Sequence, residues 1–356
     1  MRRFYKHTLC IIENFRLTNP HLHHGLLGKG TCDSARRTYT SGVTPAIWFE
    51  AIGFGVGLLF GSFLNVCISR LPAHESIVRP GSRCMSCGHA VRWYDNVPVL
   101  SWLVLRARCR DCGAGISWRY PAVELAVGVW FAIGAGKLEL LYHLREHVSD
   151  LQDWYFYGTQ VAIVGFAVLG FLLIGLMVMD WRTQRLPDAF TLPGIGIGFV
   201  LACVRAMFLA PGEGDLVLNT THQLRMSSPG SSQAQGNVFM TGTEAMVLGR
   251  VAAIAGAALI LLLVRWIYKA LRKRDGMGLG DVKLLAMIAA FLGFGEALLA
   301  LFAGVVAASV YGLALVARKK AGGTTKLPFG SFLAAGGLFA ALFGPGLVDW
   351  YVGLLR

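Results

Sequence analysis

Long apolar runs alternate with shorter polar segments along most of the chain. A helix that crosses a lipid bilayer needs about 20 apolar residues, and most of the runs are this long. The run from 284 to 317 is too long for one helix, and Gly293 and Gly295 interrupt it, so we divide it into a short span and a longer one. The pattern predicts an all-α polytopic membrane protein with about eight transmembrane helices. The predicted spans are residues 46–68, 121–141, 159–179, 189–210, 245–266, 282–294, 297–316 and 329–350.

Composition supports a protein embedded in the membrane. The mean hydropathy is +0.55 and only 15% of residues are charged, whereas soluble domains carry about 25%. The 44 glycines agree with this class, because small residues let transmembrane helices approach closely. One such spacing, Gly57 to Gly61, predicts a packing face on the first span.

The polar segments divide the chain into parts. Residues 1–45 form a polar, basic tail that we interpret as disordered, or as sequence ahead of a translation start near Val43. Residues 69–120 follow the first span, 46–68, and we interpret them as a small domain. Residues 121–350 form the rest of the transmembrane core. Within them, residues 211–243 are rich in Gly, Ser, Thr and Gln, which predicts a flexible outer insert.

The basic residues predict the orientation. The net charge is +13, and many of the positive charges fall in a few segments between apolar runs. This distribution is typical of cytoplasmic loops, so it favours a lipid bilayer, not nucleic acid, as the partner. The segment 69–120 is therefore predicted to be cytoplasmic. Its arginines are Arg70, Arg79, Arg83, Arg92, Arg106, Arg108, Arg110 and Arg119.

Four cysteines in this segment form two Cys-x-x-Cys pairs, Cys84 with Cys87 and Cys109 with Cys112. Gly88 and Gly113 follow the pairs, which suits the tight turns of a zinc ribbon. Four thiolates at this spacing predict a tetrahedral Zn²⁺ site of structural type, because no coordination position is left open for catalysis. Disulfides are the alternative, although a reducing cytoplasm disfavours them.

Two aspartates stand at the ends of apolar runs. Asp180 ends the third span, and Asp281 follows alternating glycines and begins the sixth. The predicted topology places both at the cytoplasmic ends of their helices, and therefore at one depth. Two close carboxylates share a proton, so that one can activate water while the other polarises a peptide carbonyl. We predict that Asp180 and Asp281 form the catalytic site of an aspartyl peptidase.

Each aspartate also has a structural interpretation. Asp180 can end a helix at the interface, balanced by Arg182, and Asp281 can cap the helix that follows it. Asp188, directly after Pro187, is predicted to cap the fourth span. Lys283 is predicted to extend its ammonium group to the membrane surface.

Several ordered motifs extend this picture. The chain resembles the bacterial type IV prepilin peptidases, which are leader peptidases and N-methyltransferases of the Gly-x-Gly-Asp aspartyl protease type. The matching stretches are GSFLNV (61–66), RPGSRCMSC (79–87), WYDNVPVLSW (93–102), CRDC (109–112), ISWRYPAVE (116–124), LPD (186–188) and GLGDVK (278–283). Together with Asp180 they occur in the order that is expected for the family.

The resemblance implies a multi-pass enzyme of the bacterial inner membrane whose active site faces the cytoplasm. Asp180 and Asp281 match the family's two catalytic aspartates. The implied substrates are type IV prepilins or type II secretion pseudopilins, cut after a glycine at the end of a basic leader. The new N-terminal residue, usually phenylalanine, is then methylated with S-adenosylmethionine. No residue is assigned to bind this methyl donor, because the chain has no glycine-rich nucleotide loop.

Two other functions remain open from the sequence. The first is a peptidase without methyl transfer. The second is a membrane transporter or assembly scaffold, in which the aspartates serve as proton or ion sites and the cysteine segment is a docking module.

Overall fold

The fold was analysed in a computed structural model. It describes residues 44–73, 75–79, 81–147, 153–222, 242–273, 278–318 and 327–354. Almost all of the predicted tail 1–45 and the middle of the predicted insert 211–243 lie outside these ranges. The chain divides into two compact units, and the packing described below belongs to the larger one, Phe49–Pro345.

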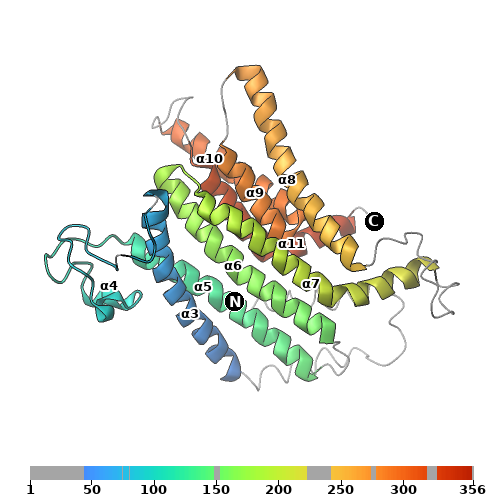
Figure 1. The fold of residues 1–356 in the computed structure, drawn as a ribbon, viewed down its shortest axis with the longest axis horizontal. Coiled ribbons are helices and arrows are strands. Elements are labelled where there is room, and N and C mark those ends of the chain that lie inside the picture. The colour runs from blue at the N-terminus through green and yellow to red at the C-terminus, as the bar shows by residue number, and fades with distance from the viewer. Residues whose placement is uncertain are drawn as a thin grey trace. The chain divides into compact units, whose positions relative to one another are not determined.

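Long helices account for most of the described residues, and the predicted all-α class is confirmed (Figure 1). Short helical turns and α4 lie between the first two long helices, at Leu71–Ala73, Trp93–Asn96 and Leu100–Val104. The long helices are α3 (Thr44–Arg70), α5 (Arg119–His147), α6 (Asp153–Thr183), α7 (Asp188–His222), α8 (Gly242–Arg272), α9 (Leu279–Leu292), α10 (Phe294–Ala317) and α11 (Phe329–Leu354).

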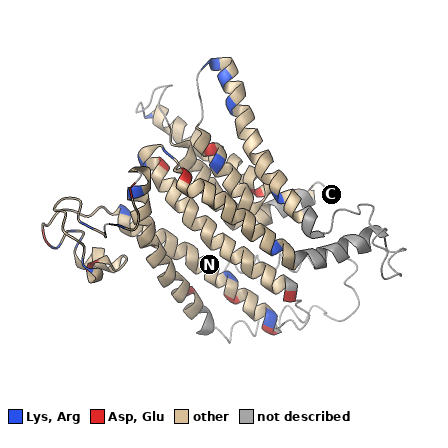
Figure 2. Ribbon diagram, viewed as in Figure 1, with Lys and Arg blue, Asp and Glu red and all other residues tan. Residues whose placement is uncertain are grey.

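Within the described residues, 7 helices are long and apolar enough to cross a membrane. The eighth helix is α9, which has 14 residues. The predicted short span at 282–294 is therefore present as a helix of less than full length. Figure 2 shows that the long helices carry few charged residues along their middle parts, as the hydropathy pattern requires.

The apolar part of α7, Asp188–Phe208, agrees with the predicted span 189–210, but the helix is longer than the span. The helix α7 continues past residue 210 and ends at His222, so the first part of the segment 211–243 is helical. The average composition of that segment concealed a local apolar run, LVL at 216–218, which is compatible with a helix.

Small residues let the first two long helices pack closely. A Cβ atom on Gly61 would lie 2.6 Å from the Cα atom of Glu124, and one on Gly57 would lie 2.7 Å from the carbonyl oxygen of Val127. No larger residue fits at either position without a shift of the backbone of α5. The glycine spacing therefore forms a helix-packing face, as predicted.

The short helix α9 lies at the centre of the core. It contacts α6, α7, α8 and α10, and most of its side chains are buried. At 1.5 Å per residue it is about 21 Å long, which is less than the hydrocarbon thickness of a bilayer. Gly293, with φ +111°, ends it. The carbonyl oxygen of Ala289 accepts from the N–H of Gly293 (3.0 Å), and Arg250 of α8 gives it a second donor from Nη1 (3.2 Å).

Candidate active site and metal site

Asp180 lies in the last turn of α6 and is buried, with 5% of its surface exposed. Its Oδ2 atom accepts a hydrogen bond from the backbone N–H of Ser331 (2.6 Å) and lies 3.0 Å from the Ser331 hydroxyl. Ser331 stands in the first turn of α11, where backbone N–H groups have no partner within the helix. The carboxylate of Asp180 therefore occupies the positive end of α11.

Asp281 lies in the first turn of α9 and is 9% exposed. The residue before the helix, at the N-cap position, is Gly278, and Asp281 interacts with the Gly278 backbone by a hydrogen bond. The structural alternative, in which Asp281 caps its helix, is therefore partly realised, although from inside the first turn. The carboxylate of Asp180 thus lies at the start of α11, and that of Asp281 lies at the start of α9. A negative charge is stabilised at such positions.

The two aspartates lie close enough for the charge of Asp180 to act on Asp281. Leu186, in the connection between α6 and α7, lies against the starts of α9 and α11. A Cβ atom on Gly280 would be 3.0 Å from Cβ of Leu186, and one on Gly330 would be 2.9 Å from its Cδ1 atom. Glycine at these positions lets the starts of α9 and α11 converge on the end of α6. These contacts bring Asp180 and Asp281 into one region of the fold.

Gly330 also lies directly against the carboxyl group of Asp180. A Cβ atom there would be 3.0 Å from both Cγ and Oδ2 of Asp180. Neither Gly330 nor Ser331 was predicted from the sequence to be a site residue. The available signal was Pro328, which precedes the last apolar run on the same predicted side of the membrane and is typical of a helix start.

An ion pair joins two helices of this region. The Nζ atom of Lys283 lies 2.6 Å from Oδ1 of Asp188, which belongs to the first turn of α7. The prediction that Lys283 only extends toward the membrane surface missed this partner. Sequence alone could not find it, because the two residues are far apart in the chain and their helices meet only in the folded protein.

The four predicted metal ligands come together. The Sγ atoms of Cys84, Cys87, Cys109 and Cys112 all lie within 4.8 Å of one another, and those of Cys84 and Cys112 are 3.8 Å apart. A tetrahedron with Zn–S bonds of 2.3 Å has edges of ~3.8 Å. The spacing of the thiols therefore fits a four-coordinate metal ion.

Each cysteine pair forms the same turn. The N–H of Gly88 donates to the Cys84 carbonyl oxygen (3.0 Å), and the N–H of Gly113 donates to that of Cys109 (2.9 Å). Both glycines have positive φ, +72° and +70°, a conformation that favours glycine. The turns that the sequence predicted are confirmed.

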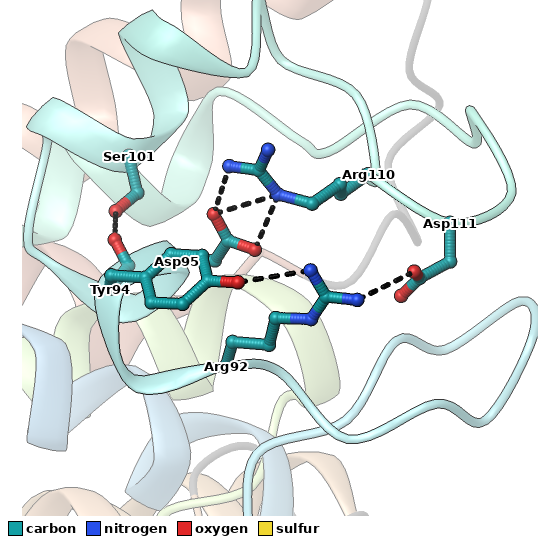
Figure 3. Close-up of polar contacts among 6 residues, drawn as sticks. All are labelled: Arg92, Tyr94, Asp95, Ser101, Arg110 and Asp111. Carbon is teal, nitrogen blue, oxygen red and sulfur yellow. Dashed lines mark hydrogen bonds and ion pairs between the residues drawn. The ribbon is translucent and has the colours of Figure 1, made fainter.

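A polar network joins the second turn to residues 92–95, which follow the first turn in the chain (Figure 3). The Arg110 guanidinium binds both carboxylate oxygens of Asp95 at 2.6–3.2 Å. This pairing holds the pKa of the Asp95 carboxyl below its ordinary value. Arg92 donates to the Tyr94 hydroxyl (2.9 Å) and lies 3.8 Å from Asp111. Arg110 and Asp111 are the middle residues of the second Cys-x-x-Cys motif, but their partners Asp95 and Arg92 lie outside both motifs, so the spacing of the cysteines did not reveal the pairing.

Comparison with known proteins gives two matching family models. Residues 56–138 match the bacterial peptidase A24 N-terminal domain, and residues 236–313 match the type IV leader peptidase family. No solved structure matches the chain.

Three relatives illustrate the similarity, and each is called a prepilin leader peptidase/N-methyltransferase. The protein of Burkholderia pseudomallei (strain 1026b) is 35% identical over 321 residues, which cover 83% of this chain and 85% of the relative. The Myxococcus xanthus protein (strain DK1622) is 35% identical over 78% of this chain and 67% of its own length. The Pseudomonas putida protein is 30% identical over 83% of this chain and 91% of its own length.

Proposed function

Because the chain belongs to the type IV leader peptidase family, we propose that it removes the leader peptide from type IV prepilins or related pseudopilins and then methylates the new N-terminus. The observation that carries the peptidase part is the burial of two interacting aspartates, Asp180 and Asp281, where the end of α6 meets the starts of α9 and α11. The methyltransferase part rests on the relatives alone.

We assign Asp180 as the ionised carboxylate and Asp281 as the protonated one. The backbone N–H of Ser331 donates to Oδ2 of Asp180, and a donor at this distance stabilises a carboxylate. Burial disfavours the charged form of Asp281, and the nearby negative charge of Asp180 disfavours it further, so Asp281 retains a proton. The assignment gives each residue a separate task in peptide hydrolysis.

The reaction then needs no covalent intermediate. Asp180 removes a proton from a water molecule, and the oxygen of that water attacks the scissile carbonyl carbon. At the same time Asp281 donates its proton to the carbonyl oxygen. The tetrahedral intermediate breaks at the C–N bond, and the leaving amine takes up the proton that Asp180 accepted. The carbonyl forms again as the diol returns a proton to Asp281, which restores the starting state.

The four-cysteine group is proposed to hold one Zn²⁺ ion, as its Sγ distances support. Four thiolates leave no free position, so the ion would stabilise the fold of the segment and would take no part in catalysis. S-adenosylmethionine would supply the methyl group, and we assign no described residue to its binding. The arginine-rich segment is proposed to face the cytoplasm, which would place Asp180 and Asp281 at the cytoplasmic side of the bacterial inner membrane.

One experiment tests both activities. The purified full-length chain in lipid nanodiscs is incubated with a prepilin and S-adenosylmethionine, and the product is examined by mass spectrometry. We expect loss of the leader and addition of one methyl group to the new N-terminus. Cleavage without methylation would show that the chain is a peptidase without methyltransferase activity. An uncut prepilin would favour the transporter or scaffold alternative.

A further inference from the structure

The short helix α4 has two unlike faces. Leu100, Leu103 and Val104 are exposed by 60%, 57% and 72%, and their spacing places them on one side of the helix. On the other side, the Ser101 hydroxyl donates to the carbonyl oxygen of Tyr94 (3.0 Å), and the Trp102 indole N–H donates to that of Ile116 (3.1 Å). Hydrogen bonds within the cysteine segment therefore fix the side of α4 that carries Ser101 and Trp102. The opposite side of α4 is apolar and exposed.

Contacts with the membrane helices set the height of α4. The backbone N–H of Val99, directly before α4, donates to Oε2 of Glu124 (2.7 Å), and Glu124 is buried in α5. Glu124 lies about 7 Å along α5 from its first residue, Arg119, at 1.5 Å per residue. Glu124 also bonds with Ser62, a residue well inside the membrane-spanning part of α3. Figure 1 accordingly shows α4 beside the first turns of α5.

Exposed basic and aromatic residues follow α4 in the chain. Arg106 and Arg108 follow α4 and are exposed, and Arg119 and the exposed Trp118 stand where α5 begins. Helices that lie in a membrane interface combine an apolar face with basic residues that attract anionic lipids. Tryptophan is enriched at the same level of the bilayer.

We propose that the outward face of α4, formed by Leu100, Leu103 and Val104, inserts into the lipid bilayer at the boundary between head groups and acyl chains. The occupant of this face is phospholipid, with anionic head groups near the arginines. The contact of Val99 with Glu124, which also bonds with Ser62 of α3, keeps this face close to both membrane-spanning helices. This anchor would hold the four-cysteine segment at a constant height on the membrane. The inference depends on the membrane location of the chain and not on the proposed peptidase activity.

The unaltered full-length chain provides the main test. It is placed in nanodiscs of phosphatidylethanolamine and phosphatidylglycerol that contain a phosphatidylglycerol with a photoreactive group at the top of its acyl chain. After irradiation, lipid adducts are mapped by peptide mass spectrometry. We expect adducts on Leu100–Val104 at a yield similar to that at Phe302, an exposed residue of α10, and several-fold above that at Val78. Equal yields at α4 and Val78, with Phe302 labelled, would overturn the proposal.

A variant pair sharpens the result. Val104→Asp should lower the adduct yield on α4 several-fold, while Val78→Asp, at an equally exposed position of the same segment, should leave it unchanged. The metal content of each variant shows whether its four-cysteine segment is still folded. If a variant loses its metal, the proposal is judged from the lipid adducts of the unaltered chain. Cross-links from α4 to an added prepilin or to a second copy of the chain, without lipid adducts, would assign the face to a protein and contradict the proposal.

Discussion

The four-cysteine segment and the aspartate site differ in how they are assembled. Each cysteine pair closes its own turn through neighbouring residues, with Gly88 and Gly113 in the same conformation. The aspartate site instead joins the end of α6 to the starts of α9 and α11, which are far apart in the chain. A locally assembled site can be predicted from spacing. A site made by packing depends on every helix that positions it.

Because the two sites are assembled separately, a substitution in one should leave the other intact. The largest loss of leader cleavage is expected for substitutions of the aspartates. Asp180→Asn or Asp281→Asn should reduce leader cleavage by roughly 10²–10⁴-fold, because each change removes a proton-transfer group. Metal content should remain that of the unaltered chain. Cleavage by the purified double variant at the normal rate would show that the dyad is not catalytic.

The cysteine segment should show the opposite behaviour. Cys84→Ser removes one of the four thiols that lie within 4.8 Å of one another, so bound metal should fall close to zero. Cleavage should decrease less than in the aspartate variants, since the metal has no place in the proposed proton transfers. Elemental analysis of purified protein measures the metal, and an unchanged metal-to-protein ratio would refute a four-cysteine site.

A smaller change tests the packing around Asp180. In Gly330→Ala the new methyl group would lie 3.0 Å from the Asp180 carboxyl and 2.9 Å from Leu186. Displacing this carboxyl should slow cleavage on the order of tenfold, in line with the cost of overpacking a core. Gly295→Ala in α10 is the matched control, because a Cβ atom there meets nothing within 4 Å. Equal rates for both variants would mean that this contact does not position Asp180.

The smallest effect is expected at the ion pair between Lys283 and Asp188. Their side chains are 32% and 60% exposed, so the coupling should be only ~0.2–1 kcal/mol. A double-mutant cycle with Lys283→Met and Asp188→Asn, with thermal stability as the readout, measures it. Strict additivity of the two single effects would show that the pair does not link α7 to α9 in the folded protein.

Much of the fold could be predicted from hydropathy. The eight predicted spans correspond to the long helices among the described residues, including the short α9. The exception is α7, where averaging over 211–243 hid the helix that continues to His222. Boundaries are less certain than elements, because the ends of helices depend on a few residues and not on the run as a whole.

The sequence by itself determined the membrane class, the approximate helix positions and the two cysteine turns. These depend on local properties, namely apolar length, glycine conformation and ligand spacing. Only the tertiary structure decided that Ser331 and Gly330 lie against Asp180, that Lys283 pairs with Asp188, and that Glu124 holds α4 beside the membrane helices. The reason is that helix periodicity shows which face of a helix is apolar, but not which neighbour covers it. That choice follows from close packing, which here depends on glycines that let particular helices approach.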